Sequence, residues 1–315
     1  MIQKPMFPEP EFPEAKFPES THVGRSEPPL KRVWPAGLLI PALFVTQLVV
    51  QSIVLLGTLF AIHGELTLNE DKLTAQIAEL AMEPLGIVVL LLPGQLIFLA
   101  FALGPALFSS EPWLRRVGLE RPQIGIGELL LCILAIPAVQ SLNILTLPLF
   151  EGTSDQLEML LNMFQRSSTG MFIAIVAAYS LLPGCCEELF FRGYFLRRFA
   201  QRSSRAAIVG FFLSAFFFAG VHFDPQHAVG VLPIGFWFAY VAWRSGSVIP
   251  AIVCHIANNL YGIISARFAT EEELAMVDVQ LGPMDSAILG ASVVCLIASV
   301  VLLGRRRGWV PEAQG

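Results

Sequence analysis

Long apolar runs follow one another along the chain from Val33 onward, and short polar loops separate them. A helix needs about 20 apolar residues to cross the hydrocarbon core of a membrane. The pattern therefore predicts an all-α fold, a multi-pass transmembrane helical bundle of about eight spans. The expected spans are 34–62, 84–109, 124–150, 170–198, 206–223, 227–243, 247–267 and 285–304.

The composition agrees with a lipid bilayer as the environment of the chain. Hydrophobic residues make up 55% of the 315 residues and charged residues only 14%, against about 25% charged in soluble domains. The net charge is −5 and no basic stripe runs along the chain, so we expect no nucleic-acid partner. The five cysteines all lie in apolar runs and lack the spacing of a disulfide framework.

The chain divides into three regions. Residues 1–32 repeat Phe-Pro-Glu and are rich in proline and charge, so we expect a disordered cytoplasmic arm. Residues 33–308 form the predicted transmembrane domain, and 309–315 form a short cytoplasmic tail.

The loops predict the orientation, because short loops rich in Lys and Arg stay on the cytoplasmic side. If eight spans alternate, the basic loop residues all fall on one side and acidic loop residues collect on the other. We therefore expect a cell-membrane protein with both termini cytoplasmic. The basic residues are Lys31, Arg32, Arg115, Arg116, Arg121, Arg197, Arg198, Arg202, Arg205, Arg244 and Arg305 to Arg307.

Two adjacent carboxylates, Glu187 and Glu188, stand at the end of the apolar run 171–183. Ionised side chains at this depth are costly and usually functional. In a helix Glu188 and Arg192 lie four residues apart on one face and can pair, while Glu187 points about 100° away. One carboxylate can then be neutralised by structure while the other remains for chemistry. Pro183 and Gly184 lie just before the pair, separated from it by two cysteines, and we expect a bend there.

Two further polar pairs follow at helical spacing. Phe218 and His222 are four residues apart in the fifth run, and His255 and Asn259 are four apart in the seventh. A single buried histidine or asparagine is most often helix-packing glue. Carboxylates, an arginine, histidines and an asparagine on three successive apolar stretches instead indicate a reacting or ion-binding centre.

These residue types suit the hydrolysis of a peptide bond. A desolvated carboxylate such as Glu187 is a stronger base than a solvated one, and a histidine nearby can hold the same water. No serine or cysteine stands in a recognisable nucleophile motif, so water is the expected nucleophile. His255 and Asn259 supply N–H donors on one face, as oxyanion stabilisation in acyl transfer requires.

The ordered motifs Glu187-Glu188-x-x-x-Arg192, Phe218-x-x-x-His222 and His255-x-x-x-Asn259 resemble those of the CPBP family of intramembrane endopeptidases, the CAAX prenyl protease and bacteriocin-processing (Abi) family. The resemblance covers a catalytic core at about 171–266. It implies that Glu187 and His222 activate water and that Glu188 and Arg192 orient the site. It also implies that His255 and Asn259 form the oxyanion hole.

The need for a metal stays open at this point. The resemblance allows a glutamate-type protease without metal, which we favour, or a Zn²⁺ enzyme with Glu187, His222 and His255 as ligands. The His-Glu-x-x-His motif of many zinc proteases is absent.

One feature of the fifth run conflicts with a shared site. At helical rise, His222 lies about 25 Å from the cytoplasmic end of its span, whereas Glu187 lies about 15 Å deep. The fifth span must therefore tilt strongly or start later than Ala206. His227, five residues beyond His222, is expected near the far surface and outside the site.

The leading hypothesis is an intramembrane endopeptidase that cleaves a peptide or membrane-protein substrate, possibly one with a prenylated C-terminal tail. The first alternative is a non-catalytic membrane scaffold or bacteriocin self-immunity protein, although a scaffold has no need of both glutamates. The second is a proton- or ion-coupled transporter, in which intramembrane carboxylates and histidines are also typical. Against it, the polar groups cluster in one half of the chain without a matching broken helix in the other.

Overall fold

A computed structural model describes residues 30–145, 149–150, 152–269 and 282–309. Every regular element in this described part is a helix, which confirms the all-α prediction. The expected disorder of the arm falls almost wholly outside the described residues, as does the tail from residue 310. The elements are α1 (Leu30–His63), α2 (Glu70–Ala81), α3 (Pro84–Leu90), α4 (Leu92–Leu107), α5 (Trp113–Arg116), α6 (Ile126–Leu134), α7 (Ile136–Gln140), the 3₁₀ helix η1 (Ser141–Leu145), α8 (Asp155–Arg166), α9 (Thr169–Glu188), the π-helix η3 (Leu189–Leu196), α10 (Arg197–Ala200), α11 (Ser204–Gly220), α12 (Pro225–Ser245), α13 (Ile249–Phe268) and α15 (Pro283–Gly304).

All eight predicted apolar runs lie on helices. Within the described residues, six helical segments are long and apolar enough to cross a membrane. The other two runs are α12, which is not among the six, and α11, which at 17 residues is shorter. The fold is thus a multi-pass helical membrane bundle, as the hydrophobic pattern predicts.

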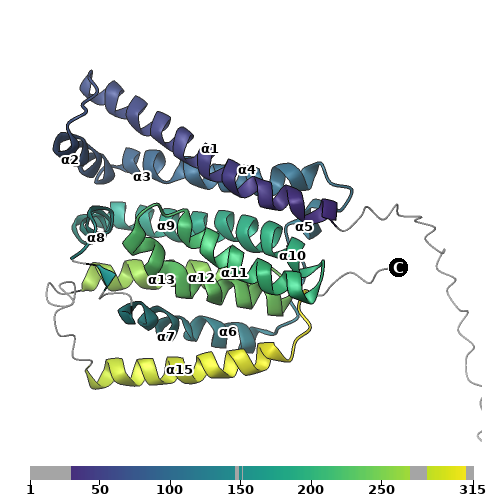
Figure 1. Ribbon diagram of the computed structural model, residues 1–315. Helices are drawn as coiled ribbons and strands as arrows, with labels where there is room; N and C mark the ends of the chain where they lie inside the picture. Colours follow the sequence, from purple (N-terminus) through teal and green to yellow (C-terminus); the bar gives the residue numbers. More distant parts are fainter. Residues whose placement is uncertain (1–29, 146–148, 151, 270–281, 310–315) are drawn as a thin grey trace, which may run out of the picture.

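The helices form three layers (Figure 1). One outer layer holds α1, α3 and α4, the central layer holds α9 to α13, and the other outer layer holds α6, α7 and α15. From one side α4 packs against α9 and η3, and from the other α7 contacts α12 and α6 contacts α13. Residues of the central layer that face its neighbours are therefore deeply buried.

The second apolar run is broken at Leu91, between α3 and α4, and Pro93 lies in the first turn of α4. Because proline has no N–H, the carbonyl of Val89 loses its helical donor. Nε2 of Gln51, on α1, donates instead to the carbonyls of Val89 at 2.9 Å and Leu90 at 3.1 Å. Breaks in membrane helices are tolerated when a neighbour satisfies the freed backbone groups, and α1 does so here.

α9 and α13 approach each other closely at Gly184. A Cβ atom on Gly184 would lie 2.5 Å from Cγ1 and 3.1 Å from the backbone nitrogen of Ile256, so only glycine permits this contact. α9 runs continuously through Pro183 and Gly184, and the change to a π-helix follows at Leu189. The close approach brings the end of α9, with both glutamates, against α13.

The turn between α11 and α12 is held in a defined conformation. Phe223 has a φ of 57°, in the left-handed region that bulky residues rarely adopt. The carboxylate of Asp224 accepts the backbone N–H of His227 at 2.6 Å and so caps the start of α12. The Phe223 ring packs edge-on against Phe44 of α1, with 5.8 Å between centroids. These contacts also fix His222, which precedes Phe223.

Basic residues from loops far apart in the sequence meet at one end of the bundle. Arg244, at the end of α12, donates hydrogen bonds to the carbonyls of Leu303, Gly304 and Arg306 and so joins α12 to the end of α15. α5 and α10 lie at this end as well, whereas α2 and α8 lie at the opposite end (Figure 1). The alternation of the loops along the sequence thus corresponds to the two ends of the molecule.

Glu111 neutralises arginines at the basic end. Its carboxylate lies 2.9 Å from Arg197 Nη2, 3.2 Å from Arg116 Nη1 and 3.4 Å from Arg115 Nε. Arg197 is fully buried, so its charge needs a partner. Burial raises the pKa of Glu111, but the hydrogen bonds and charges of Arg197 and Arg116 outweigh it and hold the pKa below its ordinary value of 4.5.

Replacing Gln51 by leucine leaves the Val89 and Leu90 carbonyls without their donor. We expect the free energy of unfolding in detergent to fall by about 1 kcal/mol, the scale of a hydrogen bond inside a membrane protein. Thr58→Val is the matched control, because the Thr58 hydroxyl donates only within α1, to the Val54 carbonyl at 2.8 Å. Thermal melts that fall equally in both variants would contradict the role of Gln51.

The Glu111 cluster predicts a stability that depends on pH. Because the pKa of Glu111 is lowered in the folded chain, its ionisation stabilises the fold fully above its ordinary value of 4.5. This contribution is lost as the pH falls through the lower, folded-state pKa. We expect Glu111→Gln to melt below the wild type at neutral pH and the two curves to converge in acid. Melting curves of both proteins down to about pH 3 measure this difference.

Candidate active site

Glu188, the last residue of α9, has no exposed surface. Its Oε1 accepts hydrogen bonds from Arg192 Nη1 at 2.7 Å and from His255 Nδ1 at 2.9 Å. The pairing expected from the four-residue spacing is present, and His255 of α13 joins it. A buried charge is stable only when it is paired and hydrogen-bonded. The Glu188 carboxylate is therefore engaged by structural partners.

Arg192 lies in the π-helix η3 and is also fully buried. Its Nη2 donates to the carbonyl of Gly235, on α12, at 2.7 Å. Its Cζ lies 4.3 Å from the ring centroid of Phe218, on α11, which is a cation–π contact. Short π-helical segments inside α-helices are frequent at functional sites. Through Arg192, η3 is tied to both α11 and α12.

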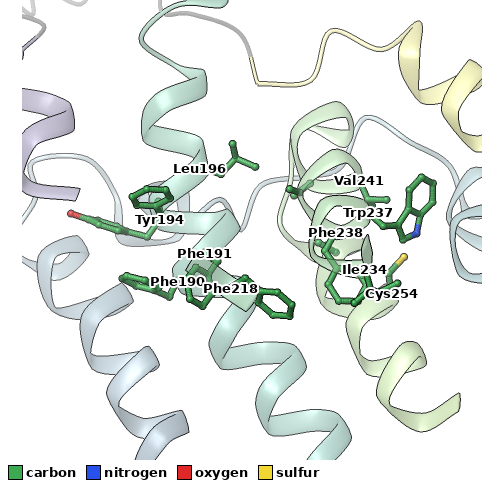
Figure 2. Packing of buried hydrophobic residues seen from close by; sticks show 14 of the residues in the cluster. Phe190, Phe191, Tyr194, Leu196, Phe218, Ile234, Trp237, Phe238, Val241 and Cys254 are labelled. Atoms are coloured by element: carbon green, nitrogen blue, oxygen red, sulfur yellow. The ribbon is translucent and has the colours of Figure 1, made fainter. Parts of the chain in front are cut away.

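Phe218 lies at the centre of the aromatic packing around the site. Figure 2 shows it beside Phe191 of η3, with 5.7 Å between ring centroids. The ring of Phe218 also lies 5.5 Å from that of His222 and 5.6 Å from that of His255. One aromatic side chain thus contacts both histidines of the predicted site.

Glu187 has a different environment from its neighbour. It is buried, with 7% of its surface exposed, and its Oε1 accepts a hydrogen bond from Nε2 of Gln95 at 3.0 Å. Unlike Glu188, it forms no ion pair with any residue that the structure describes. The sequence analysis did not identify Gln95. The available signal was an amide side chain in an apolar run, directly after the Pro93–Gly94 helix break.

His222 lies just beyond the end of α11, in the turn that leads to α12. α11 begins at Ser204, which excludes a start later than Ala206, so a strong tilt of the fifth span stays the prediction. Nδ1 of His222 faces the carbonyls of Phe218 at 3.1 Å and Ala219 at 3.2 Å. We therefore assign the ring proton to Nδ1, which leaves Nε2 as an acceptor. His222 is close enough to Glu187 for the two side chains to interact electrostatically.

His227 lies beside His222, with 4.5 Å between their ring centroids. The sequence predicted His227 outside the site, because depth was counted along a straight span. The helix ends at Gly220, however, and the turn brings His227 next to His222, while the exclusion of His227 from the site stays a prediction. Nδ1 of His227 is buried without a hydrogen-bond partner among the described residues.

His255 and Asn259 lie on the face of α13 that meets α9. His255 stacks on Phe238 at 4.8 Å and uses Nδ1 for Glu188, so Nε2 is its second polar atom. Nδ2 of Asn259 donates to the carbonyl of Tyr179, on α9, at 3.0 Å. Each NH₂ group has two protons, so one N–H of Asn259 remains beyond this contact.

The metal set considered from the sequence was Glu187, His222 and His255. Among the described residues, no group of three or more His, Cys, Asp or Glu side chains is arranged to hold a metal ion. Nδ1 of His255 is taken by Glu188 and Nδ1 of His222 faces two backbone carbonyls, which leaves Nε2 of each ring as the atom that could bind a metal.

The helices that carry these residues match a known protein family. Residues 169–261 match the family model described as type II CAAX prenyl endopeptidase Rce1-like. In this segment, which we call the Rce1-like segment, the chain is similar to that family. The match confirms the resemblance seen in the motifs, and all six predicted site residues lie inside it. At the family level it indicates a membrane endopeptidase that acts on a peptide or protein substrate at the membrane.

The Rce1-like segment spans under a third of the 315 residues. No match was found among curated proteins or among solved structures. α1, α4 and α15, which pack around the segment, therefore have to be interpreted from their own contacts.

Glu188→Gln removes the charge that balances Arg192. We expect a loss of about 3 kcal/mol in the free energy of unfolding, because an unpaired buried charge remains. The double variant Glu188→Gln, Arg192→Met should recover part of this loss, since neither charge is then left alone. Thermal melts in detergent compare the three proteins. A single variant as stable as the wild type would contradict the buried ion pair.

Proposed function

We propose that the protein is an intramembrane endopeptidase in which Glu187 and His222 activate a water molecule to hydrolyse a peptide bond. The contrast between the two adjacent carboxylates supports this assignment. Glu188 forms an ion pair with Arg192, whereas Glu187 is buried without an ion-pair partner in the described structure. Glu187 lies within electrostatic reach of both His222 and Arg192. A buried carboxylate of this kind is costly and typical of a functional site.

In the proposed reaction a water molecule lies between Oε2 of Glu187 and Nε2 of His222. Glu187 takes a proton from the water molecule while the water oxygen attacks the carbonyl carbon of the peptide. His222 orients the water by accepting its second proton in a hydrogen bond. The proton held by Glu187 then passes to the leaving amine, the C–N bond breaks, and the carboxylate is restored.

His255 and Asn259 are the proposed donors to the carbonyl oxygen as it gains negative charge. Asn259 offers the N–H that does not contact Tyr179. His255 donates from Nε2 in this proposal, while its Nδ1–H donates to Glu188. Both ring nitrogens of His255 must therefore carry a proton. One oxyanion donor contributes about 10²–10³ in kcat. Glu188 and Arg192 act through His255 as positioning residues.

We propose that this reaction needs no metal cofactor. The alternative, Zn²⁺ held by Glu187, His222 and His255, makes a clear contrary prediction for purified enzyme. Cleavage that persists in excess chelator, in a sample in which elemental analysis finds no zinc, supports the metal-free reaction. Loss of cleavage in chelator and recovery with Zn²⁺ supports the alternative.

The proposed substrate is a peptide or a membrane protein, and a prenylated C-terminal tail is one candidate. We place the enzyme in the cell membrane with both termini cytoplasmic. The basic end of the bundle, where Arg197 and Arg244 lie, supports this orientation, because arginine-rich loops stay on the cytoplasmic side.

Glu187→Ala and His222→Ala should each lower cleavage by at least about 100-fold, the usual contribution of a general base. Neither change strands a paired charge, so both variants should melt close to the wild type. Substrates can be found by trapping: the purified Glu187→Gln variant is incubated with membrane extract, and the peptides it retains are identified by mass spectrometry. Those peptides then serve as substrates for kinetic assays.

Cys185→Ala is the matched control, because Cys185 lies beside the glutamates on α9 and has no part in the proposed reaction. It should cleave at the wild-type rate. Cleavage retained by Glu187→Ala would overturn the assignment. A wild type that cleaves none of the trapped peptides but moves protons across vesicle membranes would favour a transporter, and one that does neither would favour a scaffold.

A further inference from the structure

We propose that Gln95 is a positioning residue for Glu187, so that the catalytic machinery extends from the Rce1-like segment into α4. This inference rests on the proposed function for the role of Glu187. The contact between the two side chains is independent of that role. It joins residues 92 positions apart in the sequence, one inside and one outside the segment that matches the family.

The contact is direct and shielded from solvent. Nε2 of Gln95 donates to Oε1 of Glu187 at 3.0 Å, and the two residues are 5% and 7% exposed. The other end of the amide, Oε1 of Gln95, is buried without a hydrogen-bond partner in the described part of the chain. Leaving a buried acceptor unpaired is unfavourable. The orientation of the Gln95 amide is therefore set by the carboxylate that it holds.

The helix break before α4 sets the position of this amide. Gln95 lies in the first turn of α4, two residues after Pro93. Gln51 of α1 holds the carbonyls that the break frees. At Gly94 a Cβ atom would lie 2.9 Å from Nε2 of Gln47, so α1 also packs closely against this turn. The α1 helix thus fixes the start of α4, and the start of α4 directs Gln95 towards α9.

A neutral donor suits the proposed role of the carboxylate. With Oε1 of Glu187 held by Gln95, Oε2 is left to take the proton from water. The terminal torsion of glutamate is broad, so one fixed oxygen restricts which oxygen faces the water. A cation in place of Gln95 would form an ion pair and compete with the proton for the carboxylate. Glutamine orients the base without neutralising it.

The kinetic test compares Gln95→Leu with the wild type on peptides from the trapping experiment. We expect kcat to fall by about 10- to 100-fold, since a hydrogen bond to a charged group corresponds to one or two factors of ten. KM should stay unchanged, because Gln95 contacts Glu187 and not the substrate. Gln76→Leu is the matched control: a buried glutamine on α2 that lies outside the contacts between α1 and the start of α4.

The spectroscopic test needs no substrate. The infrared difference spectrum between the wild type and Glu187→Gln isolates the carboxyl bands of Glu187. We expect these bands to shift in Gln95→Leu, which removes the hydrogen bond to Oε1, and to stay in place in Gln76→Leu. Thermal melts of both variants confirm that they are folded.

The two readouts separate the possible failures. If no peptide is cleaved but the Glu187 bands shift in Gln95→Leu, the proposed function fails and the positioning contact stands. If the wild type cleaves peptides and the bands do not shift, the inference about Gln95 is overturned, even if kcat falls. A rise in KM with unchanged kcat would also overturn it, because Gln95 would then act on substrate binding.

Discussion

The packing of the central layer depends on one pair of opposite charges that has no exposed surface. Glu188 and Arg192 face each other inside a membrane bundle, where separating such a pair costs several kcal/mol. The guanidinium lies over the ring of Phe218 and donates to the carbonyl of Gly235, and the carboxylate also holds His255. Because these partners belong to η3, α9, α11, α12 and α13, one ion pair fixes how the whole central layer fits together.

In the proposed mechanism, this ion pair leaves the neighbouring carboxylate, Glu187, available as the base. A helical turn of about 100° between consecutive residues places Glu187 on another face of the helix from Glu188, where Gln95 of α4 donates a hydrogen bond to it. If a single glutamate stood here, the arginine would neutralise it and no base would remain. With two adjacent carboxylates and one arginine, Glu188 can stabilise the fold through the ion pair while Glu187 serves as the proposed base within the same turn of helix. The proposed mechanism follows from this separation.

The sequence predicted those parts of the site that depend on local geometry. Positions four residues apart on a helix face each other, so Glu188 could be expected to meet Arg192 and Phe218 to meet His222, and both contacts are present. The hydrophobic runs likewise predicted the helices, because membrane thickness sets their length. The contact between His222 and His227 was not predicted, because the prediction assumed a straight helix and a turn after a short helix depends on packing that no local spacing reveals.

Contacts between distant helices were beyond the reach of these rules, and Gln95 is the clearest example. A proline in a membrane helix predicts a break, but the direction of the next turn depends on the neighbour that satisfies the freed carbonyls. Here Gln51 of α1 does so, and α4 then starts with its amide against Glu187. The segment that matches the family bears every predicted reactive group, yet its proposed base is held from outside it. To hold Glu187, α4 needs only one neutral hydrogen-bond donor opposite that carboxylate, and a single residue of this kind does not form a recognisable sequence motif.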